Sequence, residues 1–171
     1  MRLRRNTLLV LSCIFACSLT CASSAYASEQ LNKVKAVFLF KFFDYVSWPD
    51  NETETDTLCT YGHHPFGQDL HYIAKMRQAK KTEVIALSSL SEIDKCQILY
   101  IDNPKDQKEL SKVDIKETLV VSSSRAAINY GGIISMEEQF GRVQLYINLK
   151  TARDKKLNIS SRLLEISEVM R

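Results

Sequence analysis

The chain has 171 residues, a length that suits one domain with a single sizeable core. It carries 23 Lys and Arg against 20 Asp and Glu, a formal net charge of +3. Arg2, Arg4 and Arg5 supply that excess, so the remaining chain is neutral, with 20 basic and 20 acidic residues, and lacks the basic footprint of a nucleic-acid-binding protein.

Residues 1–27 predict a secretory signal peptide. The basic first five residues precede an apolar run over residues 8–22. Small side chains at Ala25 and Ala27 then match positions −3 and −1 of a cleavage site. We therefore expect cleavage between Ala27 and Ser28, and a mature chain over 28–171 that forms one domain.

Two other interpretations of this leader remain open. An uncleaved membrane anchor would need roughly 20 apolar residues, and the run is shorter than that. A lipoprotein would need a lipidated cysteine. Cys17 comes nearest to that pattern, but Phe15 stands where a small residue is expected.

Two cysteines, Cys59 and Cys96, follow the predicted leader. Because exported chains meet an oxidising compartment, an isolated pair favours one structural disulfide. A redox-active pair would usually be spaced C-x-x-C. The expected bridge stabilises the fold by roughly 3–4 kcal/mol in the chain-entropy model.

The first expected helix contains the stretch KAVFLFKFFDYVSWP, residues 35–49. Its apolar arc is far wider than the stripe of a one-sided surface helix. Lys41 and Asp44 interrupt a run already too short to span a membrane. Two interpretations remain: a helix packed wholly within its own domain, or a helix with one face on the domain and the other on a second protein.

The following chain alternates short apolar runs with helical patterns. The polar run Asp50–Asp56 predicts a loop. Strands are expected at Leu58–Tyr61, Glu83–Leu87, Gln97–Ile101 and Leu119–Ser122. Helices or turns are expected at Pro65–Met76, Ser89–Ile93, Lys105–Ser111 and Ser123–Ile128. Alternation of this kind predicts a mostly parallel sheet.

The pattern changes near the C-terminus. Ile133–Glu137 and Arg142–Asn148 flank a short turn at Gly141 and predict a β-hairpin, and Ser160–Met170 predicts a final helix. The expected fold is therefore α/β: a three-layer α/β/α sandwich whose mostly parallel sheet carries an antiparallel hairpin at its C-terminal edge.

No catalytic motif is present, and no cofactor or enzymatic activity is expected. The sequence lacks the phosphate-binding, nucleophile-elbow and zinc-protease patterns. His63, His64 and His71 have unsuitable spacing and no completing thiolate or carboxylate, so no metal site is expected. Since ligands of open α/β sheets bind at the carboxyl ends of strands, His63, His64 and Arg125 are candidate ligand-binding residues.

Five segments together resemble the YfiR family of periplasmic proteins. They are KAVFLFKFFDYVSWP, LCTYGHHPFGQDL (58–70), CQILYI (96–101), TLVVSSSRAAINYGGIISM (118–136) and GRVQLYINLKTARDKKLNISSRLLEIS (141–167). The resemblance covers nearly the whole mature chain. It implies a three-layer α/β/α domain, usually a homodimer, in which Cys59 and Cys96 match the structural disulfide. A second cysteine pair found in better-known members is absent here, which puts redox control through it in doubt.

The resemblance also implies a regulatory role in the periplasm. Such a protein represses an inner-membrane diguanylate cyclase by contacting the enzyme's periplasmic sensor region, and an outer-membrane OmpA-like lipoprotein or redox stress releases it. The output of cyclic di-GMP, and biofilm formation with it, depends on this control of the cyclase. The expected partner-binding residues are Phe38, Phe40, Phe43, Trp48, Arg142 and Arg162. The alternative function is a periplasmic small-ligand-binding module.

Overall fold

A computed structural model describes residues 28–49 and 54–170. The predicted signal peptide lies outside this range. A helix over residues 28–45 opens the described chain and leads directly into β1 (Val46–Ser47). This short strand pairs antiparallel with β8 (Asn158–Ile159), through Val46 opposite Ile159. The pairing holds the N-terminal helix close to the last part of the chain.

The main sheet has seven strands in the order β3-β2-β4-β5-β6-β7-β9. Their bounds are β2 Thr55–Tyr61, β3 Lys81–Leu87, β4 Ile98–Ile101, β5 Leu119–Ser122, β6 Ile134–Gln139, β7 Arg142–Asn148 and β9 Ser167–Met170. The pairs from β3 through β6 are parallel, β6 and β7 form an antiparallel hairpin, and β9 is parallel to β7.

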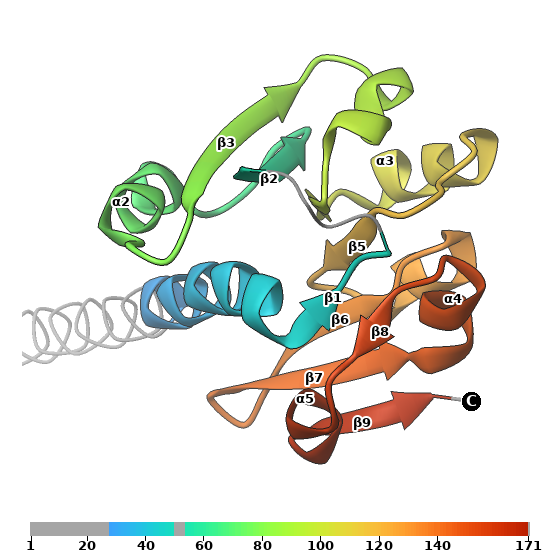
Figure 1. The fold of residues 1–171 in the computed structure, drawn as a ribbon. Coiled ribbons are helices and arrows are strands. Elements are labelled where there is room, and N and C mark those ends of the chain that lie inside the picture. The colour runs from blue at the N-terminus through green and yellow to red at the C-terminus, as the bar shows by residue number, and fades with distance from the viewer. Residues whose placement is uncertain (1–27, 50–53, 171) are drawn as a thin grey trace, which may run out of the picture.

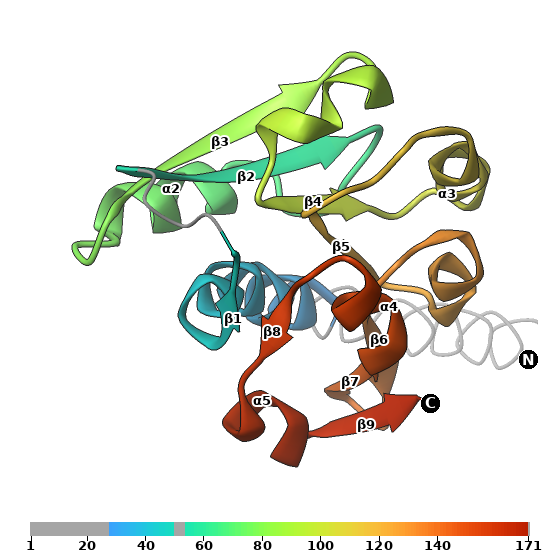
Figure 2. The ribbon, with the colours of Figure 1, turned by 45° about the vertical axis from the view of Figure 1, so that its right-hand side comes forward.

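Helices cover both faces of this sheet, which confirms the predicted three-layer α/β/α fold (Figures 1 and 2). The N-terminal helix, α2 (Asp69–Met76), α4 (Leu149–Asp154) and α5 (Ser161–Glu165) cover one face. The other face is covered by η1 (Leu90–Lys95), α3 (Pro104–Glu109), η2 (Leu110–Lys112) and η3 (Arg125–Tyr130).

Alternation along the buried strands divides the core in two. In β4, Ile98 and Tyr100 join the cluster under the N-terminal helix, while Leu99 and Ile101 join the cluster on the opposite face. All four side chains are fully buried. A strand buried on both faces reads as a continuous apolar run, which is why the sequence predicted β4 well.

The C-terminal prediction was wrong in two respects. The expected helix Ser160–Met170 ends at Glu165, and the chain continues as β9. The hairpin therefore lies one strand inside the sheet, because β9 pairs with β7 and forms the edge. Residues 167–170 form a strand because they make backbone hydrogen bonds to the free edge of β7. The spacing of apolar residues within this segment gives no information about a partner so distant in sequence.

The sequence analysis also missed α4 (Leu149–Asp154) and the short strands β1 and β8, and the other differences lie at element boundaries. β5 and β7 have the predicted bounds, whereas β2 begins at Thr55, inside the run predicted as a loop. Residues 50–53 of that run lie outside the described residues. The helix predicted over Pro65–Met76 begins only at Asp69.

Side-chain caps start several of the short helices. The Ser124 hydroxyl accepts from the backbone N–H of Ala126, and Asn148 Oδ1 accepts from that of Thr151. Gly132 follows η3, where a Cβ would lie 2.8 Å from the backbone of Ala127. A glycine is therefore required for the chain to turn from η3 into β6.

Within the described residues, no helix combines the length and apolarity needed to cross a membrane.

Candidate functional site

Cys59 and Cys96 form a disulfide across neighbouring strands, with their Cα atoms 5.7 Å apart. Cys59 lies in β2, and Cys96 lies just before β4. Both are buried in the core cluster under η1 and α3. Their burial in the core fits the structural disulfide that the sequence predicted.

The predicted ligand residues follow the carboxyl ends of β2 and β5, two strands with β4 between them, and have separate contacts. His63 is exposed in the loop after β2, and His64 stacks on Phe66 at 5.7 Å. Arg125 lies in η3, where it pairs with Glu137 at 2.9 Å and lies over the Tyr146 ring at 4.3 Å. Arg125 is thus engaged by β6 and β7.

A hydrogen-bonded chain occupies the ends of β4 and β5. The Ser123 hydroxyl donates to Asp102, so the Tyr100 hydroxyl must donate to Ser123, at 2.8 Å. Burial, and secondarily the charge of Asp102, raises the pKa of Tyr100 well above its ordinary value. The phenol therefore remains protonated. The side chains of Tyr100, Ser123 and Asp102 are thus hydrogen-bonded to one another, and we assign this cluster a structural role.

The aromatic side chains of the N-terminal helix mostly face the core. Phe40 is only 4% exposed, and Trp48 is also buried. Phe38 and Phe43 are half-buried and pack on the same core cluster. Burial gives Phe40 and Trp48 a role in packing, and neither forms part of an exposed apolar face.

The exposed apolar residues of this helix are Val34 and Val37, at 43% and 47% exposure. Next to them lies α2, with Tyr72 at 66% and Met76 at 63%. Figures 1 and 2 both show α2 beside the N-terminal helix. We call these four side chains the apolar rim.

A groove of about 290 Å³ separates the two helices. We call it the α2 groove; it is lined by Val37, Phe40, Lys41, Asp44, Ile73, Met76, Arg77, Gln78 and Ala79. Its volume is below the range of about 300–1,000 Å³ typical of small-molecule pockets. Its lining combines apolar side chains with the charged Lys41, Asp44 and Arg77.

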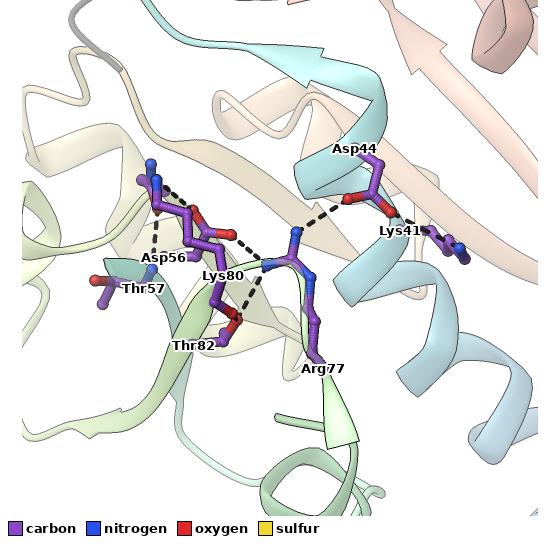
Figure 3. A network of polar contacts seen from close by, with 8 residues as sticks. Lys41, Asp44, Asp56, Thr57, Arg77, Lys80 and Thr82 are labelled. Carbon is purple, nitrogen blue, oxygen red and sulfur yellow. Dashed lines mark hydrogen bonds and ion pairs between the residues drawn. The ribbon is translucent and has the colours of Figure 1, made fainter. Parts of the chain in front are cut away.

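Charged residues lie at one end of the α2 groove, and Figure 3 shows the polar network that they form. Arg77 donates to Asp44 of the N-terminal helix at 3.0 Å, and also to Asp56 of β2. Lys80 pairs with the other Asp56 oxygen at 3.0 Å. On the outer side, Lys41 lies 3.7 Å from Asp44. Arg77 thus joins the N-terminal helix to the edge of the sheet.

The Arg77 guanidinium is held firmly in this position. Its side chain is 13% exposed, and it lies over the Phe43 ring at 5.0 Å. Burial acts to lower the pKa of Arg77, but hydrogen bonds to Asp56 and Asp44 outweigh it, so the pKa lies above its ordinary value. A permanently charged arginine fixes the geometry of the groove's end.

The remaining predicted partner residues lie away from the groove. Arg142 is exposed at the start of β7, beside the hairpin tip, and Arg162 is exposed on α5. Phe140 at that tip is fully exposed and has a left-handed backbone, with φ +50°. The structure does not bring Arg142 and Arg162 together with the helix aromatics as one surface.

Sequence reasoning missed Tyr72, Met76 and Arg77. The apolar arc of the first helix is wider than one packing face requires, but the sequence does not indicate which part of that arc α2 covers. A signal was available in Lys41 and Asp44, which mark the solvent-facing stripe and lie seven and ten residues after Val34. The position of α2 depends on tertiary packing.

Two hollows lie at the opposite, amino ends of the strands. One, of about 470 Å³, is lined in part by Trp48, Thr57, Gln97 and Thr118. The other, of about 480 Å³, shares Lys116 and Glu117 with the first. Trp48 Nε1 is buried with no hydrogen-bond acceptor among the described residues. Across 28–49 and 54–170, no group of three or more His, Cys, Asp or Glu could hold a metal ion.

The chain belongs to the DUF4154 family, described as YfiR/HmsC-like, which it matches over residues 32–168. The match includes the N-terminal helix, the α2 groove and the disulfide. It confirms the family resemblance of the sequence segments. No curated protein matches the chain in sequence.

Two solved structures resemble it distantly. One is described as an ABC domain in complex with L-Trp from Streptococcus pneumonia, with 13% identity, a TM-score of 0.40, and coverage of 67% of this chain and 55% of that one. The other is a conserved domain protein from Vibrio cholerae O1 biovar eltor str. N16961, with 11% identity, a TM-score of 0.46, and coverage of 80% and 59%. Both TM-scores are too low to support an inference about this chain.

Proposed function

We propose that this chain is a periplasmic repressor of an inner-membrane diguanylate cyclase. After cleavage of residues 1–27, the single domain docks on the periplasmic sensor region of the cyclase, lowers cyclic di-GMP and reduces biofilm output. An outer-membrane OmpA-like lipoprotein relieves this repression, and the protein acts as a homodimer without catalytic activity of its own. Membership of the YfiR/HmsC-like family supports the proposal.

The observation that carries the docking step is the apolar rim beside the α2 groove. Val34, Val37, Tyr72 and Met76 are 43–66% exposed on two neighbouring helices. Grouped exposed apolar side chains mark protein contacts more often than single ones do. Repression then requires that the rim bind the inactive state of the cyclase more tightly than the active state.

The test is a charge placed in the rim. Val37→Glu and Met76→Glu should each leave a folded protein, because both side chains are exposed, and should raise cyclic di-GMP in a deletion strain that carries the variant. Ile166→Glu is the matched control, since Ile166, just after α5, is 59% exposed. Its expected effect on cyclic di-GMP is nil. Wild-type repression by both rim variants would contradict the proposal.

A small-ligand-binding module is the second candidate. It is favoured by the hollow of about 470 Å³ at the amino ends of the strands and by Trp48 at its wall, whose indole N–H has no acceptor among the residues that the structure describes. Buried donors without acceptors are uncommon and call for an explanation. Thermal-shift screening of the mature protein with small anions, nucleotides and cell-wall fragments tests this: a module must show saturable stabilisation that depends on ligand concentration.

A further inference from the structure

The outer stripe of the N-terminal helix follows the spacing of a helix that packs on another helix. Val34, Val37, Lys41 and Asp44 are separated by three, four and three residues, and all four are exposed. In a helix these positions form one line, because three- and four-residue steps alternate around a 3.5-residue repeat. The line is apolar over its first two positions and charged over its last two.

The α2 helix supplies the second wall for an incoming element. Tyr72 and Met76 are four residues apart and lie on the same exposed side of α2. Phe40 and Ile73 lie deeper between the helices, and both pack in the core cluster. The lining runs over Val37–Asp44 of the N-terminal helix and over 73–79 at the end of α2 and just beyond it, an arrangement compatible with a helix-in-groove contact.

The charges at the end of the α2 groove leave one cation available. Arg77 is engaged by Asp44 and Asp56, and Lys80 by Asp56. Lys41 contacts Asp44 only at 3.7 Å, and its side chain is 57% exposed. Among the described residues of this network, Lys41 is therefore the most exposed cation and the one with the longest ion-pair distance. An acidic side chain facing Lys41 would balance its charge.

We infer that the α2 groove receives an amphipathic helix of the partner, apolar where it faces Val34 and Val37, and carrying a Glu or Asp opposite Lys41. This inference rests on the proposed function and specifies the kind of element through which the cyclase binds. The large side chains of the incoming helix enter between Val37 and Met76. Its acidic residue lies at the groove's charged end.

A second copy of this chain fits the full stripe poorly. An antiparallel copy aligned along the stripe sets Val37 against the partner's Lys41, and Val34 against the partner's Asp44. A parallel copy sets two Lys41 side chains together, and two Asp44 side chains likewise. Burying charge against apolar groups or like charge is unfavourable. The complementary occupant is therefore a different helix.

Photo-crosslinking in the native host provides the first test. Benzoyl-phenylalanine replaces Val37 or Met76 in the full chain, with Ile166 as the matched control position, and the crosslinked peptides are sequenced by mass spectrometry. We expect positions 37 and 76 to reach one peptide from the periplasmic part of a diguanylate cyclase, with apolar residues three or four apart and an acidic residue beyond them. Crosslinks to an extended peptide, to lipid or to a second copy would overturn the inference.

Charge exchange provides the second test. Lys41→Glu should weaken binding of the purified periplasmic region of that cyclase about fivefold, as for loss of an exposed ion pair. A Lys in place of the partner's acidic residue should restore the affinity of Lys41→Glu. Unchanged affinity, or no rescue, refutes the helix orientation.

Failure of this inference can be distinguished from failure of the proposed function. If Val37→Glu relieves repression but the crosslinked peptide is not helical, only this inference fails. If no cyclase is crosslinked and cyclic di-GMP does not respond, the proposed function fails as well.

Discussion

Arg77 is the side chain on which the geometry of the α2 groove depends most. Arg77→Ala leaves Asp56, which is nearly fully buried, with Lys80 as its one remaining ion-pair partner within 28–49 and 54–170. Removing one member of a buried ion pair costs about 3–5 kcal/mol, and the remaining Lys80 contact places the expected loss of unfolding free energy at about 3 kcal/mol. Urea denaturation measures it.

Lys150→Ala is the control for this substitution. Lys150 pairs with Asp154 at 2.9 Å, but both side chains are well exposed. Its loss should change the unfolding free energy by less than about 1 kcal/mol. Equal effects of the two substitutions would show that Arg77 does not hold the groove as described.

His64 gives the fold a defined dependence on pH. Burial lowers the pKa of His64, and the neighbouring His63 and His71 lower it further. The unfolded chain, with a histidine pKa of about 6.5, therefore binds more protons than the folded chain as the pH falls below that value. Stability should decrease from pH 7 toward pH 5. His64→Phe should flatten this decrease and match the wild type in slope near pH 8; identical urea-denaturation profiles at all pH values would exclude the effect.

The N-terminal helix combines a core face with an exposed stripe, and one pair of substitutions separates them. Phe40→Ala should lower the unfolding free energy by about 3–5 kcal/mol, because it removes a buried aromatic ring from the core cluster. Val37→Ala should change it by about 0.5 kcal/mol or less, because the side chain is half exposed. Thermal denaturation distinguishes them. A similar large loss for Val37→Ala would place that residue in the core.

The parallel strands could be predicted from sequence because each is a short run of apolar residues, and that run alone indicates a buried strand. β4 and β5 consist of consecutive buried residues bounded by turn-forming ones. β9 could not, because its strand conformation comes from pairing with β7, more than twenty residues earlier in the chain. The spacing of Leu163, Leu164, Ile166 and Val169 was compatible with a helix until that partner was known.

The candidate site was only partly predictable for a related reason. The excess apolar surface of residues 35–49 was compatible with a helix packed wholly within its domain or with a second face on a partner, and Phe40 and Trp48 belong to the face that packs within the domain. The outer face depends on α2, whose own residues Tyr72 and Met76 show no unusual pattern. A groove between two helices is a property of their packing, and neither segment contains it alone.

The disulfide links the stability of the fold to the α2 groove. Cys59 and Cys96 are separated by 37 residues, and the loop that they close contains α2, β3 and η1. β3 is an edge strand held by β2 alone. This loop therefore carries one wall of the groove together with an edge strand, and the disulfide ties its ends to neighbouring central strands.

Replacing both cysteines with alanine should therefore affect folding and docking together. In the chain-entropy model, Cys59→Ala with Cys96→Ala lowers the unfolding free energy by about 3–4 kcal/mol for a loop of this length. Hydrogen exchange should rise more in α2 and β3 than in β6 and β7, because the opened loop frays from the sheet edge. Reductant should reproduce both changes in the wild-type mature chain and add nothing to the double variant. Uniform hydrogen exchange across the sheet, or a further effect of reductant on the double variant, would show that the disulfide does not stabilise the groove.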